Sequence, residues 1–146
     1  MPEGSYNGFY SGIVEDNKDP DCLGRLKVRI AGCNDNWNLD DIKWSEPCFP
    51  FGGYLDQGFF MIPEIGSYVI VAFIEGSQEK PIWLGCHHKK ETNKPPCEAS
   101  LEANEFYTYR KQIKTPAGYI MFDDKEMRIY LVHKSGSFIT FIKSFA

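Results

Sequence analysis

The sequence lacks several features that would assign a function class at once. It has no apolar stretch near the roughly 20 residues of a membrane-spanning helix, and residues 1–8 have neither the basic region nor the apolar core of a signal peptide. No G-x-S-x-G, glycine-rich phosphate loop or H-E-x-x-H motif is present. Positive charge is not in excess either, because the formal net charge is -4. These absences argue against enzymes of those classes and against a main role in phosphate neutralisation.

The cysteines lack the pattern of a disulfide framework or a metal site. Their number is odd and no C-x-x-C pair occurs, so we expect reduced thiols in a protein made in a cytoplasm. The five are Cys22, Cys33, Cys48, Cys86 and Cys97. The alternative is a metal site built from Cys86, His87, His88 and Cys97. Because three adjacent residues do not easily reach one ion, we expect neither a metal nor another cofactor.

What the sequence does have is the composition and patterning of a β-rich globular chain. The 146 residues are 42% hydrophobic and 15% aromatic, enough for one domain or for one small domain with an appendage. Residues 62–86 predict a strand, a polar turn and a second strand. Residues 68–74 are a continuous run of apolar residues, rich in β-branched and aromatic side chains, near a glycine at each end. Since both faces of this run are apolar, we expect both to be covered.

Another hairpin precedes this one. Residues 9–15 and 24–31 predict two strands, separated by turn-forming residues at positions 16–21. In the second strand, Leu26, Val28 and Ile30 alternate with Arg25, Lys27 and Arg29. The basic residues could contact phosphates, as OB folds do. No aromatic residue alternates with them for base stacking, so a solvated or inter-subunit charged face is the favoured interpretation.

The segment between the hairpins is expected to be irregular. Residues 32–41 are polar and predict a loop, with a short helix near residues 39–42. Residues 43–51 are apolar but contain Pro47 and Pro50, which favour an edge strand or an extended segment.

The C-terminal part predicts a separate β-meander. Residues 91–106 are polar and contain two adjacent prolines, which favours a linker. Four short strands follow, near residues 107–115, 118–123, 127–133 and 137–143. One face should carry Ile120, Phe122, Ile129, Leu131, Ile139 and Phe141. The opposite face looks apolar too, and because a lone sheet of this size cannot cover two apolar faces, we expect other copies of the chain to cover them.

Three motifs in this order resemble a known family. The first hairpin carries Val14, Asp16, Asn17, Asp19, Pro20, Gly24, Arg25, Leu26, Lys27 and Val28. The second carries Pro63, Gly66, Val69, Val71, Phe73, Gly76, Pro81, Ile82 and Gly85. The meander carries Thr115, Gly118, Met121, Phe122, Asp123 and Asp124. Together they resemble the OB-fold module and following spike of phage baseplate central spike proteins and of VgrG proteins of type VI secretion.

The resemblance implies an all-β fold, in which a five-stranded OB-fold barrel precedes a short trimeric β-prism or β-helix. It implies a barrel at residues 1–90, a linker at 91–106 and a prism at 107–146. The sequence departs from the family in length, because it has no lysozyme-like insert between the two parts and no long needle after Phe141. The barrel core should contain Leu26, Val28, Ile30, Val69, Val71 and Phe73. The six residues named on the meander face should then form the trimer interface.

The function implied by the resemblance is structural. A homotrimer would plug the end of a tail tube and link a tail-tube-like hub protein to a membrane-piercing tip. It would be assembled in the bacterial host cytoplasm, reside in the virion tail baseplate and meet a membrane only during penetration. No histidine or cysteine follows His133, so we expect a separate cap protein at the C-terminal end and no apical metal. Nucleic acid is not an expected partner of the trimer, and we expect no catalytic residues, with Asp123 and Asp124 as turn-forming residues. The alternative is a solitary OB-fold binder of single-stranded nucleic acid or carbohydrate.

Overall fold

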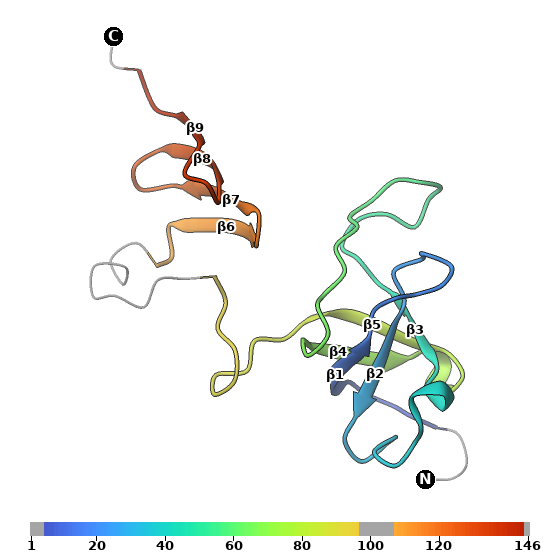
Figure 1. The fold of residues 1–146 in the computed structure, drawn as a ribbon. Helices are drawn as coiled ribbons and strands as arrows, with labels where there is room; N and C mark the ends of the chain where they lie inside the picture. The colour runs from blue at the N-terminus through green and yellow to red at the C-terminus, as the bar shows by residue number, and fades with distance from the viewer. Residues whose placement is uncertain (1–4, 97–106, 145–146) are drawn as a thin grey trace. The chain divides into compact units, whose positions relative to one another are not determined.

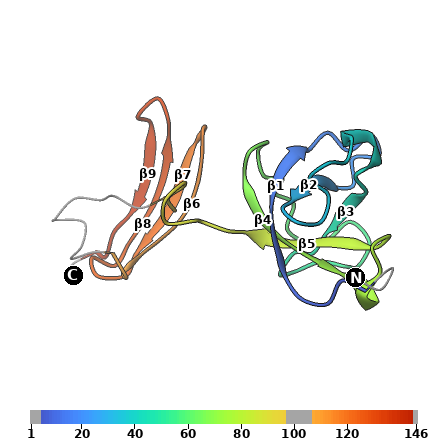
Figure 2. The same cartoon turned by 90° about the horizontal axis from the view of Figure 1, so that it is seen from below.

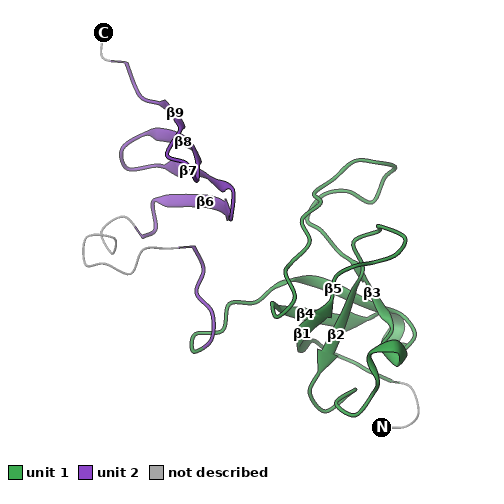
Figure 3. Ribbon diagram, viewed as in Figure 1, with its two compact units in different colours: residues 1–91 green, residues 92–146 purple. Residues whose placement is uncertain are grey.

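The computed structural model describes residues 5–96 and 107–144 of the chain. The fold is all-β, as predicted, and divides into two compact units at residues 1–91 and 92–146 (Figure 3). Residues 97–106 of the expected linker lie outside the described residues. Within the described part, no helix has the length and apolar character needed to cross a membrane.

The first unit is a closed five-stranded barrel with the strand order β1-β2-β3-β5-β4 (Figure 1 and Figure 2). Its strands are β1 (Tyr10–Asp16), β2 (Leu26–Ile30), β3 (Trp44–Pro47), β4 (Tyr68–Phe73) and β5 (Pro81–Cys86). Two short 3-10 helices, η1 (Leu39–Asp41) and η2 (Ile74–Gly76), complete the unit. Both predicted hairpins are present, because β1 pairs antiparallel with β2 and β4 pairs antiparallel with β5. The five-stranded barrel expected from the sequence is thus confirmed.

The prediction of an edge strand at residues 43–51 was wrong. Strand β3 pairs antiparallel with β2, and parallel with β5 through Glu46–Ile82 and Pro47–Trp83, so it closes the barrel. Pro47 cannot donate a hydrogen bond, but the next residue can: the Cys48 N–H donates to the Trp83 carbonyl at 2.9 Å. Since the parallel ladder is only two residue pairs long, one proline within it is tolerated.

The core lies inside the barrel and is small. Its buried apolar residues are Val14, Leu26, Val28, Ile30, Val69, Val71 and Trp83. Five of the six residues expected in the core are among them, while Phe73 packs partly buried against the cluster. The Trp83 ring also donates through Nε1 to the Gly24 carbonyl at 3.0 Å, which ties β5 to the turn before β2.

Strand β4 is buried on one face only, contrary to the expectation that both faces are covered. Val69 and Val71 point inward and are fully buried, whereas Tyr68, Ile70 and Ala72 are half-buried. A barrel strand packs one face into the interior, and its outer face meets solvent or a partner. Core packing therefore accounts for the inward residues of the apolar run but not for the apolar residues on its outer face.

The second unit is a four-stranded antiparallel meander with the order β6-β7-β8-β9. Its strands are β6 (Arg110–Thr115), β7 (Gly118–Asp123), β8 (Arg128–His133) and β9 (Phe138–Phe141). Strand β6 begins three residues later than the first residue of the predicted strand, because residues 107–109 form a turn. The two outer strands, β6 and β9, are the edges of the sheet.

Candidate functional site

One face of the second sheet carries a continuous apolar surface. In the register, Ile120 lies opposite Leu131, and Leu131 opposite Ile139, and residues opposite each other in an antiparallel sheet point to the same face. We call this surface the apolar sheet face; its apolar members are Ile113, Ile120, Phe122, Ile129, Leu131, Ile139 and Phe141. Lys111, opposite Phe122, is a charged residue on the same face at the β6 edge. All six residues proposed for the prism interface lie here, together with Ile113, which the sequence pattern did not single out.

The apolar sheet face is large for a chain of this size. Its apolar members are between 40% and 64% exposed within the single chain. Taking about 200 Å² for a fully exposed large apolar residue, they present about 700 Å², whereas the largest patch on a typical monomer is about 300–600 Å². At about 25 cal/mol/Å², covering this face would contribute on the order of 15 kcal/mol per chain, before the costs of association are subtracted.

The opposite face of the sheet carries the apolar residues expected there, Tyr119, Met121, Tyr130, Val132 and Phe138, and in addition polar residues from β6. Its three rows contain polar or charged residues from β6, because Arg110, Gln112 and Lys114 lie there in register with β7. In the first row, Arg110 lies opposite Asp123, and Asp123 opposite Arg128. The alternation of β6 was not assigned from the sequence, and the polarity of this face was therefore missed. The face that carries Ile120, Leu131 and Ile139 has fewer polar side chains than the opposite face and is better suited to a dry interface.

Asp123 fixes the turn between β7 and β8. Its carboxylate is buried and accepts hydrogen bonds from the backbone N–H groups of Lys125 at 3.1 Å and Glu126 at 3.0 Å. Arg110 Nε donates to the other carboxylate oxygen at 3.3 Å. Burial raises the pKa of Asp123, but the Glu126 N–H and the Arg110 side chain outweigh burial and lower the pKa below its usual value. The expected turn-forming role of Asp123 is confirmed.

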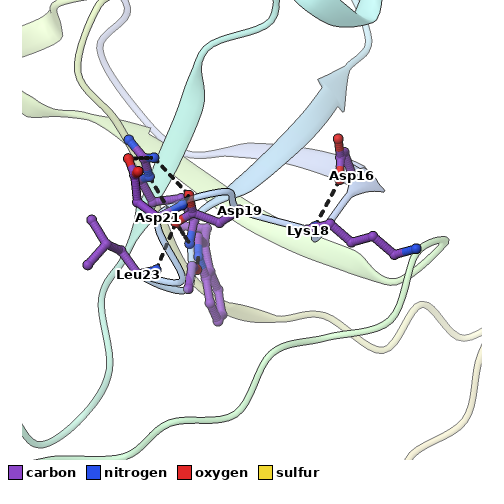
Figure 4. Close-up of polar contacts among 8 residues, drawn as sticks. Asp16, Lys18, Asp19, Asp21 and Leu23 are labelled. Carbon is purple, nitrogen blue, oxygen red and sulfur yellow. Dashed lines mark hydrogen bonds and ion pairs between the residues drawn. The ribbon is translucent and has the colours of Figure 1, made fainter.

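Asp19 has the same role in the turn between β1 and β2 (Figure 4). Its carboxylate accepts bonds from the N–H groups of Asp21 at 3.0 Å and Leu23 at 3.0 Å. Arg25 donates to it through Nε at 2.9 Å and Nη2 at 2.7 Å. This arginine, followed by the backbone donors, holds the pKa of Asp19 far below its usual range. The Asp and Arg of the first motif are thus a structural pair that shapes the turn.

The three basic residues Arg25, Lys27 and Arg29, just before β2 and within it, do not form a solvated face. Arg25 binds Asp19, as described above, and Arg29 pairs with Glu15 at 2.7 Å. Lys27 is only 7% exposed, and its Nζ donates to the Leu39 carbonyl at 2.8 Å. Because side chains from neighbouring segments cover the row, its donors are engaged within the chain. The interpretation as a solvated charged face was therefore wrong, while the other interpretation, an inter-subunit charged face, stays a prediction.

An aromatic residue does lie beside this basic row, on the neighbouring strand. Lys27 pairs with Trp44 in the β2–β3 register, and the Lys27 Nζ lies 5.2 Å from the Trp44 ring centroid. The Arg25 guanidinium carbon lies 5.8 Å from the same centroid. These distances fit cation–π contacts. Trp44 was missed because the sequence shows alternation along one strand and not the pairing between strands.

The potential metal ligands do not assemble within the described residues. No group of three or more His, Cys, Asp or Glu side chains in residues 5–96 and 107–144 is arranged to hold an ion. Cys86 follows the last buried position of β5 and is exposed. Cys97, the remaining cysteine of the suggested site, lies outside the described residues.

His133 has a hydroxyl neighbour that the sequence did not suggest. Its Nδ1 lies 2.8 Å from Ser135 Oγ and accepts from the Ser135 N–H at 3.2 Å. Ser135 Oγ in turn lies 3.3 Å from Ser137 Oγ. His133 is the last residue of β8, and Ser135 and Ser137 lie in the exposed connection to β9. The contact is a local turn interaction, since the ring accepts from the backbone of the same turn.

Comparison with known families gives one match to the barrel. The family described as the type VI secretion system/phage-baseplate injector OB domain matches residues 10–88, more than half of the chain. The match begins at the first residue of β1 and ends two residues after β5. A comparison with curated proteins gave no match.

Proposed function

Since the chain belongs to the family of type VI secretion system/phage-baseplate injector OB domains, we propose that it forms a homotrimer at the centre of the baseplate. Membership of the family makes the chain a structural component of the baseplate of a phage tail or related injection system. The trimer would plug the end of the tail tube and link the hub to the membrane-piercing tip. The second unit would serve as a short trimeric β-prism, and the chain would act without catalysis.

The observation that carries the trimer is the apolar sheet face. A single four-stranded sheet with one exposed apolar face and one mixed face needs a cover on the apolar side. Three copies around a threefold axis, each turning this face inward, would bury Ile120, Leu131 and Ile139 together. The mixed face, with its Arg110–Asp123–Arg128 row, would then remain in water. This arrangement buries the face with fewer polar side chains and leaves the charged row in water.

A tip protein at the C-terminal end is supported by the contrast between the two edges of the sheet. Strand β6 carries Arg110, Lys111 and Lys114, the kind of residues that protect an edge from pairing. Strand β9 has no charge and no proline, and its Phe138, Ile139 and Phe141 are exposed. The β9 edge is therefore open to an additional strand or to a cap that covers it.

The alternative, a solitary OB-fold binder of single-stranded nucleic acid, receives less support from the barrel. Such binders align free cationic groups with stacking aromatics. Here Arg25 and Arg29 are paired with carboxylates, and Lys27 is buried against η1. These groups would have to leave existing partners before they could bind phosphate.

The test is the mass of the full chain in solution and its response to one substitution on each face. Native mass spectrometry should show three chains of 16.7 kDa each. Leu131→Asp places a charge on the apolar sheet face and should give monomers, because three carboxylates would be buried around the axis. Val132→Asp, on the adjacent residue of β8 but on the mixed face, is the matched control and should remain trimeric.

The two outcomes that contradict the proposal are specific. A wild-type chain that is monomeric at the concentrations of the assay removes the trimer, and its binding to labelled single-stranded DNA would favour the alternative. If Leu131→Asp is as trimeric as wild type, then the interface lies outside the apolar sheet face.

A further inference from the structure

The loop between β3 and β4 contains an ordered projection that no role yet assigned explains. We call residues 51–61 the finger loop; Figure 1 shows it extending beyond the barrel strands on the same side as the β1–β2 turn. The Phe59 N–H donates to the Phe51 carbonyl at 3.1 Å, and the Gln57 N–H to the Tyr54 carbonyl at 3.2 Å. At its base the two arms approach so closely that a Cβ on Gly58 would lie 2.6 Å from the Phe51 carbonyl oxygen. The finger loop is therefore a defined structure and not a slack connection.

The segment that follows the finger loop is attached to the β1–β2 turn. Asn17 Nδ2 donates to the Pro63 carbonyl at 3.0 Å. A Cβ on Gly24 would lie 3.0 Å from Ile62 and 3.3 Å from Phe60, so the glycine permits close packing of the two loops. Since the turn is itself fixed by Asp19, the finger loop has a rigid support.

The finger loop exposes more apolar surface than a free loop in water is expected to do. Its large apolar residues that are exposed are Phe51, Tyr54, Leu55, Phe59, Phe60 and Met61. At about 200 Å² for each fully exposed residue, they present about 750 Å², close to the roughly 800 Å² that one partner contributes to a standard protein–protein interface. The finger loop alone therefore offers enough surface for a stable contact.

Leu55, at the tip of the finger loop, is unusual in both its exposure and its backbone conformation. It is 82% exposed, and its φ of +46° lies in the left-handed region, where a residue with a Cβ is disfavoured by about 1–2 kcal/mol. Glycine would fit this position without strain, and a polar residue would suit its exposure. The positive φ is required by the two-residue turn between Tyr54 and Gln57, but the turn does not require a large apolar side chain at its exposed tip.

We propose that the finger loop inserts into an apolar groove of the baseplate hub protein, with Leu55 as its central anchor. This inference rests on the proposed function and adds the surface through which the barrel docks. Residues 48–66 contain two acids, Asp56 and Glu64, and no lysine or arginine. Asp56 is next to Leu55 at the tip, so the groove should offer a basic side chain or free N–H groups there.

A second copy of this chain fits the finger loop less well than a different protein does. Three finger loops meeting around a threefold axis would bring three Asp56 carboxylates together, and like charges in a desolvated contact are unfavourable. A hub groove with a cationic group meets the same carboxylate with the opposite sign. The charge of Asp56 therefore disfavours contact of finger loops with one another and favours an occupant that supplies a cationic group, which the proposed hub groove would do.

The experiment uses the full chain and the hub protein encoded in the same gene cluster, both purified. Leu55→Gly removes the anchor and relieves the left-handed strain, so its thermal midpoint should equal or exceed that of wild type. Its affinity for the hub should fall on the order of 30-fold, the effect typical of a hot-spot residue. Phe9→Ala, a matched change at another exposed apolar residue, should leave hub affinity unchanged.

A photo-crosslinking residue at position 55 identifies the occupant directly. In the mixture of full chain and hub, position 55 should crosslink to an apolar segment of the hub, while the same residue at exposed position Lys80 should not. Crosslinks from position 55 only to another copy of this chain, or unchanged hub affinity in Leu55→Gly, would overturn the proposal. The mass of the chain in solution separates the failure of the proposed trimer from the failure of the finger loop contact. If the chain is monomeric but still needs Leu55 to bind the hub, the trimer proposal is wrong and the finger loop proposal stands.

Discussion

Leu26→Ala tests whether the barrel core is packed as described. Leu26 is fully buried at the first position of β2, and it belongs to the cluster around Val28, Val71 and Trp83. The change deletes three carbon groups, which costs about 2.4 kcal/mol at ~0.8 kcal/mol each. If the cavity of roughly 80 Å³ does not relax, a further ~2 kcal/mol is lost. We expect the free energy of unfolding to fall by about 2.5–4.5 kcal/mol.

The chain carries its own reporter for this measurement. All three tryptophans, Trp37, Trp44 and Trp83, lie in the first unit, so tryptophan fluorescence in urea follows the barrel and not the sheet. Leu55→Ala, at the exposed finger tip, is the control and should change stability by no more than about 0.5 kcal/mol. A loss under about 1 kcal/mol in Leu26→Ala would mean that Leu26 is not enclosed. Its strand would then be out of register by one residue, with Lys27 facing inward.

Three further predictions concern residues around this core. Phe73→Ala should cost about 2–3 kcal/mol in the same assay, less than for a fully buried phenylalanine, because Phe73 is partly buried and stacks on Tyr6 at 4.8 Å; no measurable loss would place its ring in solvent. Wild-type stability should fall as pH drops below about 4, since the pKa of Asp19 is 3.8 when unfolded and lower when folded. The carboxylate then stabilises the fold above that pH and loses its effect as the folded state takes up the proton; Asp19→Asn should flatten this part of the profile, and parallel profiles would contradict the assignment. Gly24→Ala should destabilise the barrel by about 1–2 kcal/mol and Gly24→Asn by less, because φ is +78° there and asparagine tolerates this region best; equal effects would argue against backbone strain as the cause.

The strands and the core were largely predictable from the sequence for a local reason. Alternation with a period of two marks the inward face of β2 at Leu26, Val28 and Ile30, and this signal needs no knowledge of neighbouring strands. The glycines and aspartates between strands marked the turns by the same kind of local rule. The apolar sheet face followed from the same periodicity in β7, β8 and β9.

Two of the errors arose because the pattern within one strand does not show which residues that strand meets. Proline chemistry suggested an edge for β3, but the Cys48 N–H restores the hydrogen bond to β5 that Pro47 cannot make. The alternation at Arg25 and Arg29 suggested a solvated face. In the structure, Arg25 pairs with Asp19 in the preceding turn and Arg29 pairs with Glu15 on the neighbouring strand. The finger loop was missed because its exposed aromatics have no period. A sequence pattern shows where a side chain points, and only the assembled barrel shows what it meets.

The two candidate interaction surfaces, the finger loop and the apolar sheet face, each lie beside a turn that a buried aspartate holds in place. Next to the finger loop, Asp19 accepts from backbone N–H groups of its own turn and from an arginine; beside the apolar sheet face, Asp123 does the same with Arg110. Each carboxylate is buried and has a lowered pKa, so each turn is held as a charged, fully bonded unit at neutral pH. A surface that is rigid before it meets its partner loses less conformational entropy on binding. Asp19 and Asp123 therefore fix the turns that support the two proposed interaction surfaces.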